Sequence, residues 1–440
     1  MPASPRAVRH LALAACVGLP VLAQAQDFDK LIDARLPAVM PKVVAWRRDI
    51  HAHPELSFEE VRTAALVAAH LKSLGLEVTT GVGRTGVVGV LRGGKPGPVV
   101  ALRADMDALP VTEQVDLPFR SRAKARWQGQ DVGVMHACGH DNHVAILMGA
   151  AEVLAGLRAQ VPGTVKFIFQ PAEEGLGGAK AMVTDGALAA PTPSAIFGLH
   201  VWPNRVGTIA VKPGPFMAAA GNFHIVVKGR QTHGSSPWKG VDPIVVASQI
   251  VLGLQTIASR QVDVTYQPSV ITIGAINGGN RSNIIPDSVV MQGTLRTFDD
   301  GMRADIAARI RRTAEDIARA GGATAIVTVD EGGLVTANDT SLTERMLPTL
   351  RRAAPAGVGA IPPVTGSEDF PVFTRDLPGI FFFLGVTPKD RDPLTAPANH
   401  SPLFFADEGA LETGVRAMSA LALDYLRNPL PPRKPGTAGG

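Results

Sequence analysis

The chain has very little cysteine. Only two of its 440 residues are cysteines, Cys16 and Cys138, and the first lies in a segment with the pattern of a secretory signal. Small exported proteins that depend on disulfides carry several cysteines in even number, so a disulfide framework is excluded here. An unpaired Cys138 in an exported protein needs another explanation, such as burial, catalysis or metal ligation.

The chain also lacks long apolar runs and concentrated charge. No internal segment reaches the roughly 18 uninterrupted apolar residues of a membrane-spanning helix. The formal net charge is only +4, and the 43 Lys and Arg residues are scattered rather than clustered, unlike those of nucleic-acid-binding proteins. With 45% hydrophobic and 19% charged residues, we expect a globular protein that acts on a small molecule, with no nucleic-acid partner and no membrane contact once the signal is removed.

Residues 1–25 are typical of a secretory signal peptide. Basic residues at positions 6, 9 and 10 precede the apolar stretch LALAACVGLPVLA, and AQA at 23–25 has the small-x-small pattern of a cleavage site. This predicts a periplasmic or secreted protein. The tetrapeptide LAAC at 13–16 also resembles a lipoprotein box, which leaves a lipoprotein signal at Cys16 as the alternative.

The mature chain predicts an α/β protein with one inserted domain. Two helices are expected between Phe28 and Leu76, after which short apolar runs alternate with amphipathic segments; the runs are VVALRA (99–104), VKFIFQ (165–170), AIFGLHV (195–201) and, much later, GIFFFLG (379–385). Strands that are apolar on both faces and alternate with helices indicate a mostly parallel sheet. The segment 221–331 breaks this alternation with the order β-α-β-β-α-β of a ferredoxin-like unit. We therefore predict a domain in two parts, 26–220 and 332–427, an inserted domain at 221–331, and a flexible tail at 428–440.

Metal-binding and acid-base residues follow each buried run of the first domain. Ligands of open α/β sheets sit beyond the carboxyl ends of the strands, so topology should bring these side chains to one rim. They are Asp105, Asp107, Glu173, Glu174 and His200, and the motif MHACGHDNHV (135–144) and His400 are expected to join them. Buried carboxylates and imidazoles need partners, and a divalent metal is the economical one.

The residue types favour a borderline first-row ion. Cys138, His140, His200, His400 and one carboxylate form a mixed sulfur, nitrogen and oxygen set, which suits Zn²⁺ better than Mg²⁺ or Ca²⁺. One of the adjacent Glu173 and Glu174 can bind metal while the other acts as general base. Asp105 and Asp107 can orient the ligand histidines from outside the ligand set.

Cys138 has a rival interpretation as a nucleophile. A thiol enzyme would need a histidine within hydrogen-bond reach, and His136 or His140 could serve. The density of additional ligands favours the metal. In the same motif, Asp141 and Asn142 are expected to cap the following helix, and His136 and His143 to pack around the ligands.

Nine segments together resemble the amidohydrolase branch of the M20 metallopeptidases, which includes hippurate hydrolases, N-acyl-amino-acid amidohydrolases and auxin-conjugate hydrolases. The segments are WRRDIHAHPELSFEE, ALRADMDALPVTE, MHACGHDNHVAILMGAA, FIFQPAEEGLGGAKAMV, FGLHVWP, HGSSPWKGVDPI, IIPDSVVMQGTLRTFD, TGSEDF and NHSPLF. They span about Phe28 to Leu426. The resemblance implies a zinc-exopeptidase type of catalytic domain that hydrolyses N-acyl amino acids with two divalent metal ions per subunit, which can be Zn, Mn, Co or Ni. It implies that the two-part domain is catalytic and that the inserted domain is a lid and dimerisation domain.

The resemblance also implies a role for each matching residue. Cys138, His140, Glu174, His200 and His400 would bind the metals, with Cys138 bridging, and Glu173 would be the base. His233 would contact the substrate carbonyl or carboxylate, often across a homodimer (or a higher oligomer) formed through the inserted domain, and Asn283 is a further candidate for substrate contact.

One position departs from the family pattern. Trp238 follows Pro237 where the family often has histidine, so the role of that second histidine is open here. A dipeptidase or carboxypeptidase of the same superfamily is the close alternative. A non-catalytic binding protein for acyl-amino acids and a Cys138 thiol hydrolase are the distant ones.

Overall fold

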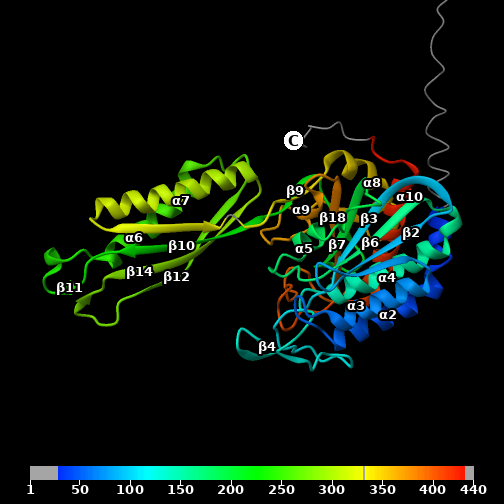
Figure 1. The fold of residues 1–440 in the computed structure, drawn as a ribbon, viewed down its shortest axis with the longest axis horizontal. Helices are drawn as coiled ribbons and strands as arrows, with labels where there is room; N and C mark the ends of the chain where they lie inside the picture. Colours follow the sequence, from blue (N-terminus) through cyan, green and yellow to red (C-terminus); the bar gives the residue numbers. More distant parts are fainter. Residues whose placement is uncertain (1–27, 331, 432–440) are drawn as a thin grey trace, which may run out of the picture.

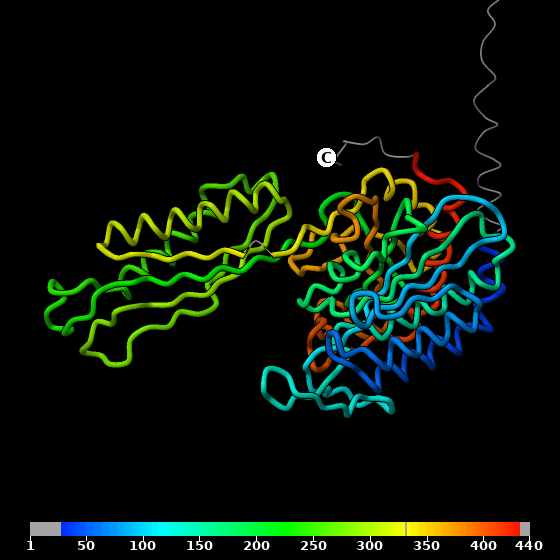
Figure 2. Tube along the Cα trace, viewed as in Figure 1, coloured from blue at the N-terminus to red at the C-terminus, as the bar shows by residue number. Residues whose placement is uncertain are grey.

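The computed structural model describes residues 28–330 and 332–431. The predicted signal (1–25), including Cys16, and most of the predicted tail lie outside these residues. Within them the chain forms two units, a larger α/β unit and an elongated second unit, which are joined by two chain segments (Figures 1 and 2).

An eight-stranded mixed sheet forms the centre of the larger unit. Its strand order is β1-β2-β6-β3-β7-β18-β8-β17, and the inner pairs β6/β3, β3/β7 and β7/β18 are parallel. The strands are β1 (Glu77–Val82), β2 (Gly86–Arg92), β3 (Lys95–Asp105), β6 (Pro162–Gln170), β7 (Ala195–Arg205), β8 (Ile209–Ala210), β17 (Val358–Gly359) and β18 (Gly379–Thr387). The inner strands read as near-continuous apolar runs because both faces of the sheet are covered.

Helices cover both faces of this sheet. The larger core lies under α2 (Leu36–Ala52), α3 (Val61–Ser73), α4 (His140–Gly156), α8 (Thr340–Ala353) and α10 (Leu411–Arg427). The opposite face packs against α5 (Gly178–Thr184) and α9 (Pro371–Thr374). Alternate residues of one strand serve the two cores: in β3, Val100 and Leu102 face the first and Ala101 faces the second. This alternation follows from the two-residue period of a strand.

The second unit has the predicted β-α-β-β-α-β order. Its antiparallel sheet has the order β12-β14-β10-β15, and both helices pack on one face (Figure 1). The elements are β10 (Ala219–Lys228), α6 (Pro243–Thr256), β12 (Ser269–Gly278), β14 (Ser288–Thr297), α7 (Asp300–Ala320) and β15 (Thr324–Asp330). The expected fold class, a mostly parallel α/β domain with an inserted ferredoxin-like unit, is therefore confirmed.

Short elements complete the chain. They are the hairpin β4 (Lys124–Trp127) and β5 (Gln130–Gly133), the pair β9 (Gly214–Met217) and β16 (Thr336–Asn338) beside the connection between the units, the pair β11 (Thr232–His233) and β13 (Ile284–Ile285), and the single turns η1 (Arg158–Gln160), η2 (Pro237–Lys239), η3 (Ile257–Gln261) and η4 (Glu408–Ala410). No helix among the described residues is long and apolar enough to cross a membrane.

The sequence did not predict β1 and β2. Most of β1 is exposed, so its apolar pattern is weak, and β2 is short and contains Gly86 and Gly89. Glycine and solvent-facing residues both lower strand propensity. Antiparallel pairing of β2 with β6 forms the strand nonetheless.

Candidate metal centre and base

The carboxyl ends of the inner strands meet at one edge of the sheet, as the topology predicted. Five overlapping groups of potential metal ligands gather there, two of which share Cys138, and within each group the ligand atoms lie within 4.8 Å of one another. The first of these two is Cys138, His140 and His200; the second is Cys138, Glu174 and His400. Cys138 belongs to both, so one sulfur atom lies where a ligand shared by two ions would have to be.

Backbone carbonyl groups hold both buried ligand histidines in one tautomer. His140 Nδ1 donates to the carbonyl of Asp107 at 2.7 Å, and His200 Nδ1 donates to the carbonyl of Val201 at 2.7 Å. In the neutral ring, which metal binding requires, each Nε2 carries the lone pair. That of His200 lies 3.3 Å from Cys138 Sγ, and that of His140 is buried with no hydrogen-bond partner among the described residues. A hydrogen bond on the far nitrogen is the usual arrangement for a metal-binding histidine.

His400 and Glu174 complete the second group. His400 Nε2 lies 3.2 Å from Cys138 Sγ and 3.2 Å from Glu174 Oε1, a buried carboxylate oxygen that forms no hydrogen bond within residues 28–330 and 332–431. His400 has the left-handed φ of 71°, which is costly for a residue with a side chain. Its backbone N–H donates to Ala137, and the Asn399 amide donates to the carbonyl of Cys138 at 3.0 Å. The His400 loop is thus fastened directly to the motif that contains Cys138.

The charges of the cluster call for a cation. Burial opposes protonation of His140, but Asp105 and Asp107 raise its pKa to about 10. Burial and the nearby Glu174 and Glu173 raise the pKa of the Cys138 thiol well above its usual value. A thiolate and a neutral imidazole therefore form together only where metal ions replace these protons. The donor set fits two divalent ions of the Zn²⁺ type.

The same facts argue against a free thiol nucleophile. A catalytic cysteine needs a lowered pKa, an electropositive setting and partial exposure. Cys138 is only 7% exposed, and burial together with the carboxylates of Glu174 and Glu173 raises its pKa instead of lowering it. His136, the other histidine proposed as its partner, is fully buried, and burial lowers its pKa to about 3.

Asp107 positions the turn that carries the two glutamates. Its carboxylate accepts hydrogen bonds from the backbone N–H groups of Glu173 at 3.0 Å and Glu174 at 3.1 Å, and from the Ser57 hydroxyl at 2.6 Å. Its peptide oxygen accepts from His140 Nδ1 at 2.7 Å, and its carboxylate Oδ1 lies 3.4 Å from the same nitrogen. Asp107 therefore fastens both the candidate base and a candidate ligand, a double role that spacing alone did not predict.

Asp105 contacts a histidine outside the predicted ligand set. Its Oδ1 accepts from His143 Nδ1 at 2.5 Å, and His143 Nε2 in turn accepts from the Val201 N–H, next to His200. Asp105 lies 3.9 Å from His140 Nδ1, too far for a hydrogen bond. It therefore supports His200 indirectly, through a histidine that packs behind the ligands.

The carboxylate of Glu173 lies beside two further acids. Its oxygen is within 4.8 Å of those of Glu368 and Asp369, from the TGSEDF segment. Burial, Glu368 and Glu174 raise the pKa of Glu173 well above its usual value. The guanidinium of the fully buried Arg103 forms ion pairs with Glu368 at 2.8 Å and with Asp105 at 2.7 Å. No sequence pattern indicates a role for Arg103, because it lies inside an apolar strand and only the tertiary structure brings these partners to it.

The predicted capping role of Asp141 and Asn142 is wrong. Helix α4 is preceded by Gly139, which has φ 88° and has room for no side chain, because a Cβ atom there would lie 2.3 Å from Val201. Asp141 lies one residue inside the helix and forms a buried ion pair with Arg47 at 2.9 Å. The Asn142 amide donates to Gly139 O and Asp141 Oδ1 rather than accepting from a backbone N–H.

The two predicted substrate contacts of the inserted unit lie elsewhere. His233 is on β11 and Asn283 immediately precedes β13, a strand pair at the end of the unit that points away from the metal cluster (Figure 1). Both residues are exposed, and His233 Nδ1 accepts from Ser235. Trp238 in η2 is 76% exposed. Within one chain, therefore, these residues are not part of the site.

Comparisons of the sequence and of the structure with known proteins lead to the same family. The sequence pattern of Peptidase family M20/M25/M40 matches residues 101–424. The chain is 42% identical over 390 residues to thermostable carboxypeptidase 2 of Saccharolobus solfataricus, covering 87% of this chain and 95% of that one. It is 38% identical over 377 residues to N-acetyl-L-cysteine deacetylase of Bacillus subtilis, covering 86% of each chain. It also resembles the crystal structure of the Bacillus subtilis YXEP protein, a dinuclear metal-binding M20 peptidase, with a TM-score of 0.75, 36% identity and coverage of 89% of this chain and 99% of that one.

Proposed function

This chain belongs to peptidase family M20/M25/M40, and from that premise we propose that it hydrolyses the amide bond of N-acyl amino acids, hippurate-like conjugates among them, to a carboxylic acid and a free amino acid. The family and the ligand groups make the protein a metal-dependent hydrolase. The similarity to a deacetylase of an N-acyl amino acid supports the substrate class. The observation that carries the proposal is the half-buried carboxylate of Glu173 beside two groups of metal ligands.

The residues divide into metal ligands and a proton carrier. Cys138, His140, Glu174, His200 and His400 would hold the two ions, which supply Lewis acidity to a carbonyl group and a water molecule when bound. Glu173 accepts the proton of the attacking water and delivers it to the leaving amine nitrogen. Its neighbours Glu368 and Glu174 favour the protonated form, which suits a group that has to hold a proton between the two transfers.

His233 would serve the site of a second copy of this chain. It lies at the end of the inserted unit that points away from the ligand groups of its own chain, which supports a role in the site of another subunit (Figure 1). Helix α6 of the same unit presents three large apolar side chains to solvent: Ile244 is 42% exposed, Val245 53% and Leu252 71%. An exposed apolar stripe on a helix fits a subunit interface. We place the homodimer contact on this unit, with His233, and Asn283 beside it, stabilising the developing oxyanion across the interface.

Cleavage of peptides is the second candidate function. It is favoured by the 42% identity to a protein named thermostable carboxypeptidase. Both reactions release an amino acid with a free carboxylate, so the catalytic groups do not distinguish them. The difference lies in the group on the far side of the scissile amide.

A substrate panel separates the two candidates. The mature protein, reconstituted in turn with Zn²⁺, Mn²⁺, Co²⁺ and Ni²⁺, would be assayed for amino acid release from N-acetyl and N-benzoyl amino acids and from dipeptides. N-acyl amino acids should give the higher kcat/KM. A preference for dipeptides with every metal would assign the protein to the peptidases instead.

A further inference from the structure

A buried acid outside the ligand set touches the turn that carries the base. Glu60 lies immediately before α3 and is 0% exposed. Its Oε1 accepts from the backbone N–H groups of Phe58 at 3.0 Å and Ala172 at 2.9 Å, and its Oε2 accepts from the Thr85 hydroxyl at 2.5 Å. No Lys, Arg or His in residues 28–330 and 332–431 forms an ion pair with it. A buried carboxylate without a counter-ion is costly, and burial raises the pKa of Glu60 to about 7.

Both backbone groups that Glu60 binds belong to strained residues. Phe58 has φ 65° and Ala172 has φ 51°, in the left-handed region that residues with a Cβ avoid. Such a conformation costs of order 1–3 kcal/mol and persists only where the surroundings impose it. One carboxylate oxygen therefore holds two unfavourable turns in place at once.

Ala172 directly precedes Glu173. Its carbonyl accepts from the Gly178 N–H at 3.0 Å, while the next two N–H groups, of Glu173 and Glu174, are bound by Asp107. Three consecutive N–H groups of this turn are thus held by two carboxylates. Asp107 acts at the glutamates themselves, and Glu60 fixes the residue whose backbone angles set the direction in which the Glu173 side chain leaves the turn.

We propose that Glu60 is a positioning residue for the base: as a hydrogen-bond acceptor it keeps Ala172 left-handed and so aims the Glu173 carboxylate at the reacting atoms. The proposal rests on the role assigned to Glu173 above. What Glu60 supplies is an acceptor at a fixed place, not a charge. The glutamine side chain has the same length, can accept both N–H groups at its oxygen and can donate its amide to Thr85.

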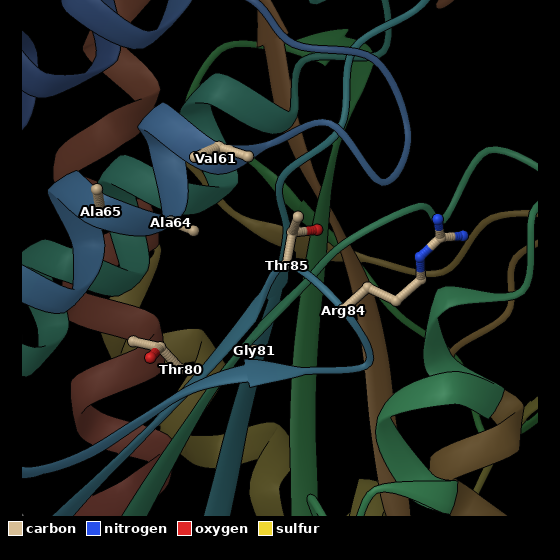
Figure 3. Close-up of a pocket in the computed structure, with 7 residues that line it drawn as sticks. All are labelled: Val61, Ala64, Ala65, Thr80, Gly81, Arg84 and Thr85. Carbon is tan, nitrogen blue, oxygen red and sulfur yellow. The ribbon is translucent and has the colours of Figure 1, made fainter.

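The third contact of Glu60 lies near the protein surface. Thr85 lines a pocket of about 280 Å³ together with Val61, Ala64 and Arg84 (Figure 3). The Arg84 guanidinium lies 4.4 Å from the centre of the Phe58 ring and so supports the other strained turn. Glu60 therefore contacts Thr85, near the surface, on one side and the turn that carries Glu173 on the other.

Substitution of Glu60 tests this proposal in the metal-loaded protein. The substrate is any amide that the wild type cleaves, so that failure on N-acyl amino acids alone counts against the proposed function and not against Glu60. Glu60→Ala should lower kcat about 100-fold at saturating metal with little change in KM, since a small displacement of a catalytic group costs about that much. Glu60→Gln should stay within about threefold of the wild type because it restores the acceptor. Amide hydrogen exchange over residues 172–178 should accelerate in the alanine variant only.

Two further variants keep the test decisive. Glu60→Asp retains the charge but withdraws the acceptor by one methylene, so it should lose kcat even if the alanine variant does not fold. Lys166→Met is the matched control, because Lys166 is also buried and its ammonium group donates to the carbonyl groups of Ala187 and Ala189, which belong to neither ligand group; it should lower stability but not kcat. The proposal is overturned if Glu60→Asp keeps wild-type kcat, if Glu60→Gln falls as far as Glu60→Asp, or if Lys166→Met loses kcat equally.

Discussion

Sγ of Cys138 lies 3.2 Å from Nε2 of His400, although 262 residues separate them in the chain. The contact joins the N-terminal and C-terminal parts of the catalytic unit, on either side of the inserted unit. It brings a soft sulfur ligand and an imidazole into one group with Glu174. The first prediction follows from this pair.

Metal removal should abolish activity, whereas alkylation should not while metal is bound. A chelator takes away the ions, and the Cys138 thiol then becomes protonated because burial and nearby carboxylates raise its pKa. Activity is measured after dialysis against chelator, after addition of Zn²⁺ or Mn²⁺, and after iodoacetamide with and without metal. A chelated protein that remains fully active but is inactivated by iodoacetamide would identify a thiol enzyme.

Replacement of Glu173 by alanine should abolish turnover and leave the metals in place. Glu173 is the proton carrier and is not one of the five proposed ligands, so the expected loss of kcat is about 10²–10⁴-fold. Metal content is measured on the same sample by elemental analysis. Glu174→Ala is the comparison, since it should lose metal as well as activity. Equal metal loss in both variants would contradict the separate roles.

Mixing two inactive variants should restore activity if His233 acts across a dimer. Glu173→Ala and His233→Ala dimers are unfolded together, or co-expressed, so that their subunits exchange. Each mixed dimer then has one site with both residues intact, and a random mixture should reach about a quarter of wild-type activity. No recovery in a preparation shown to contain mixed dimers would argue against His233 acting in trans.

Loss of the buried ion pair between Arg47 of α2 and Asp141 of α4 should destabilise the fold. Arg47 and Asp141 have side chains only 2% and 1% exposed, and Asp141→Ala leaves Arg47 with Glu408 alone at 3.3 Å. Breaking such a pair from one side costs about 3 kcal/mol of unfolding free energy. Urea denaturation of the metal-free protein measures it. Glu77→Ala breaks the exposed pair with Arg92 and should leave the midpoint almost unchanged.

Glu60 should make stability depend on pH between about 4.5 and 7. The folded state binds the proton of Glu60 more tightly than the unfolded state does, because burial raises its pKa from 4.5 to about 7. The unfolded chain therefore gives up this proton first as pH rises, and stability falls across this window. Glu60→Gln removes the effect, so its stability relative to the wild type should be greater at pH 8 than at pH 5, by about 2 kcal/mol. A difference independent of pH would rule out the raised pKa.

The sequence was sufficient to predict which side chains meet at the sheet edge. Each of them follows a buried apolar run or belongs to a short motif, and the parallel strands of an α/β sheet have to bring those ends together. Cys138, His140, Glu174, His200 and His400 converge for this reason, and the β-α-β-β-α-β order of the inserted unit could be predicted from its apolar runs. Residues 1–25 lie outside the described part of the chain, so the secretory signal stays a prediction.

Tertiary structure alone decided which groups hold these residues in place. In sequence, Arg103 is only an unusual charge in a strand, because its partner Glu368 lies 265 residues away. Glu60 is only a common acid before a helix, because its partner Ala172 lies 112 residues away. The same holds for Asp141, whose position near a helix start predicted a cap until Arg47 of α2 proved to be its partner. The distance of His233 from its own metal cluster depends on the extended shape of the inserted unit (Figure 1). Local patterns determine which strand ends carry chemistry, since the strand period and the parallel topology act over short stretches, whereas buried hydrogen bonds and strained turns depend on packing between distant segments.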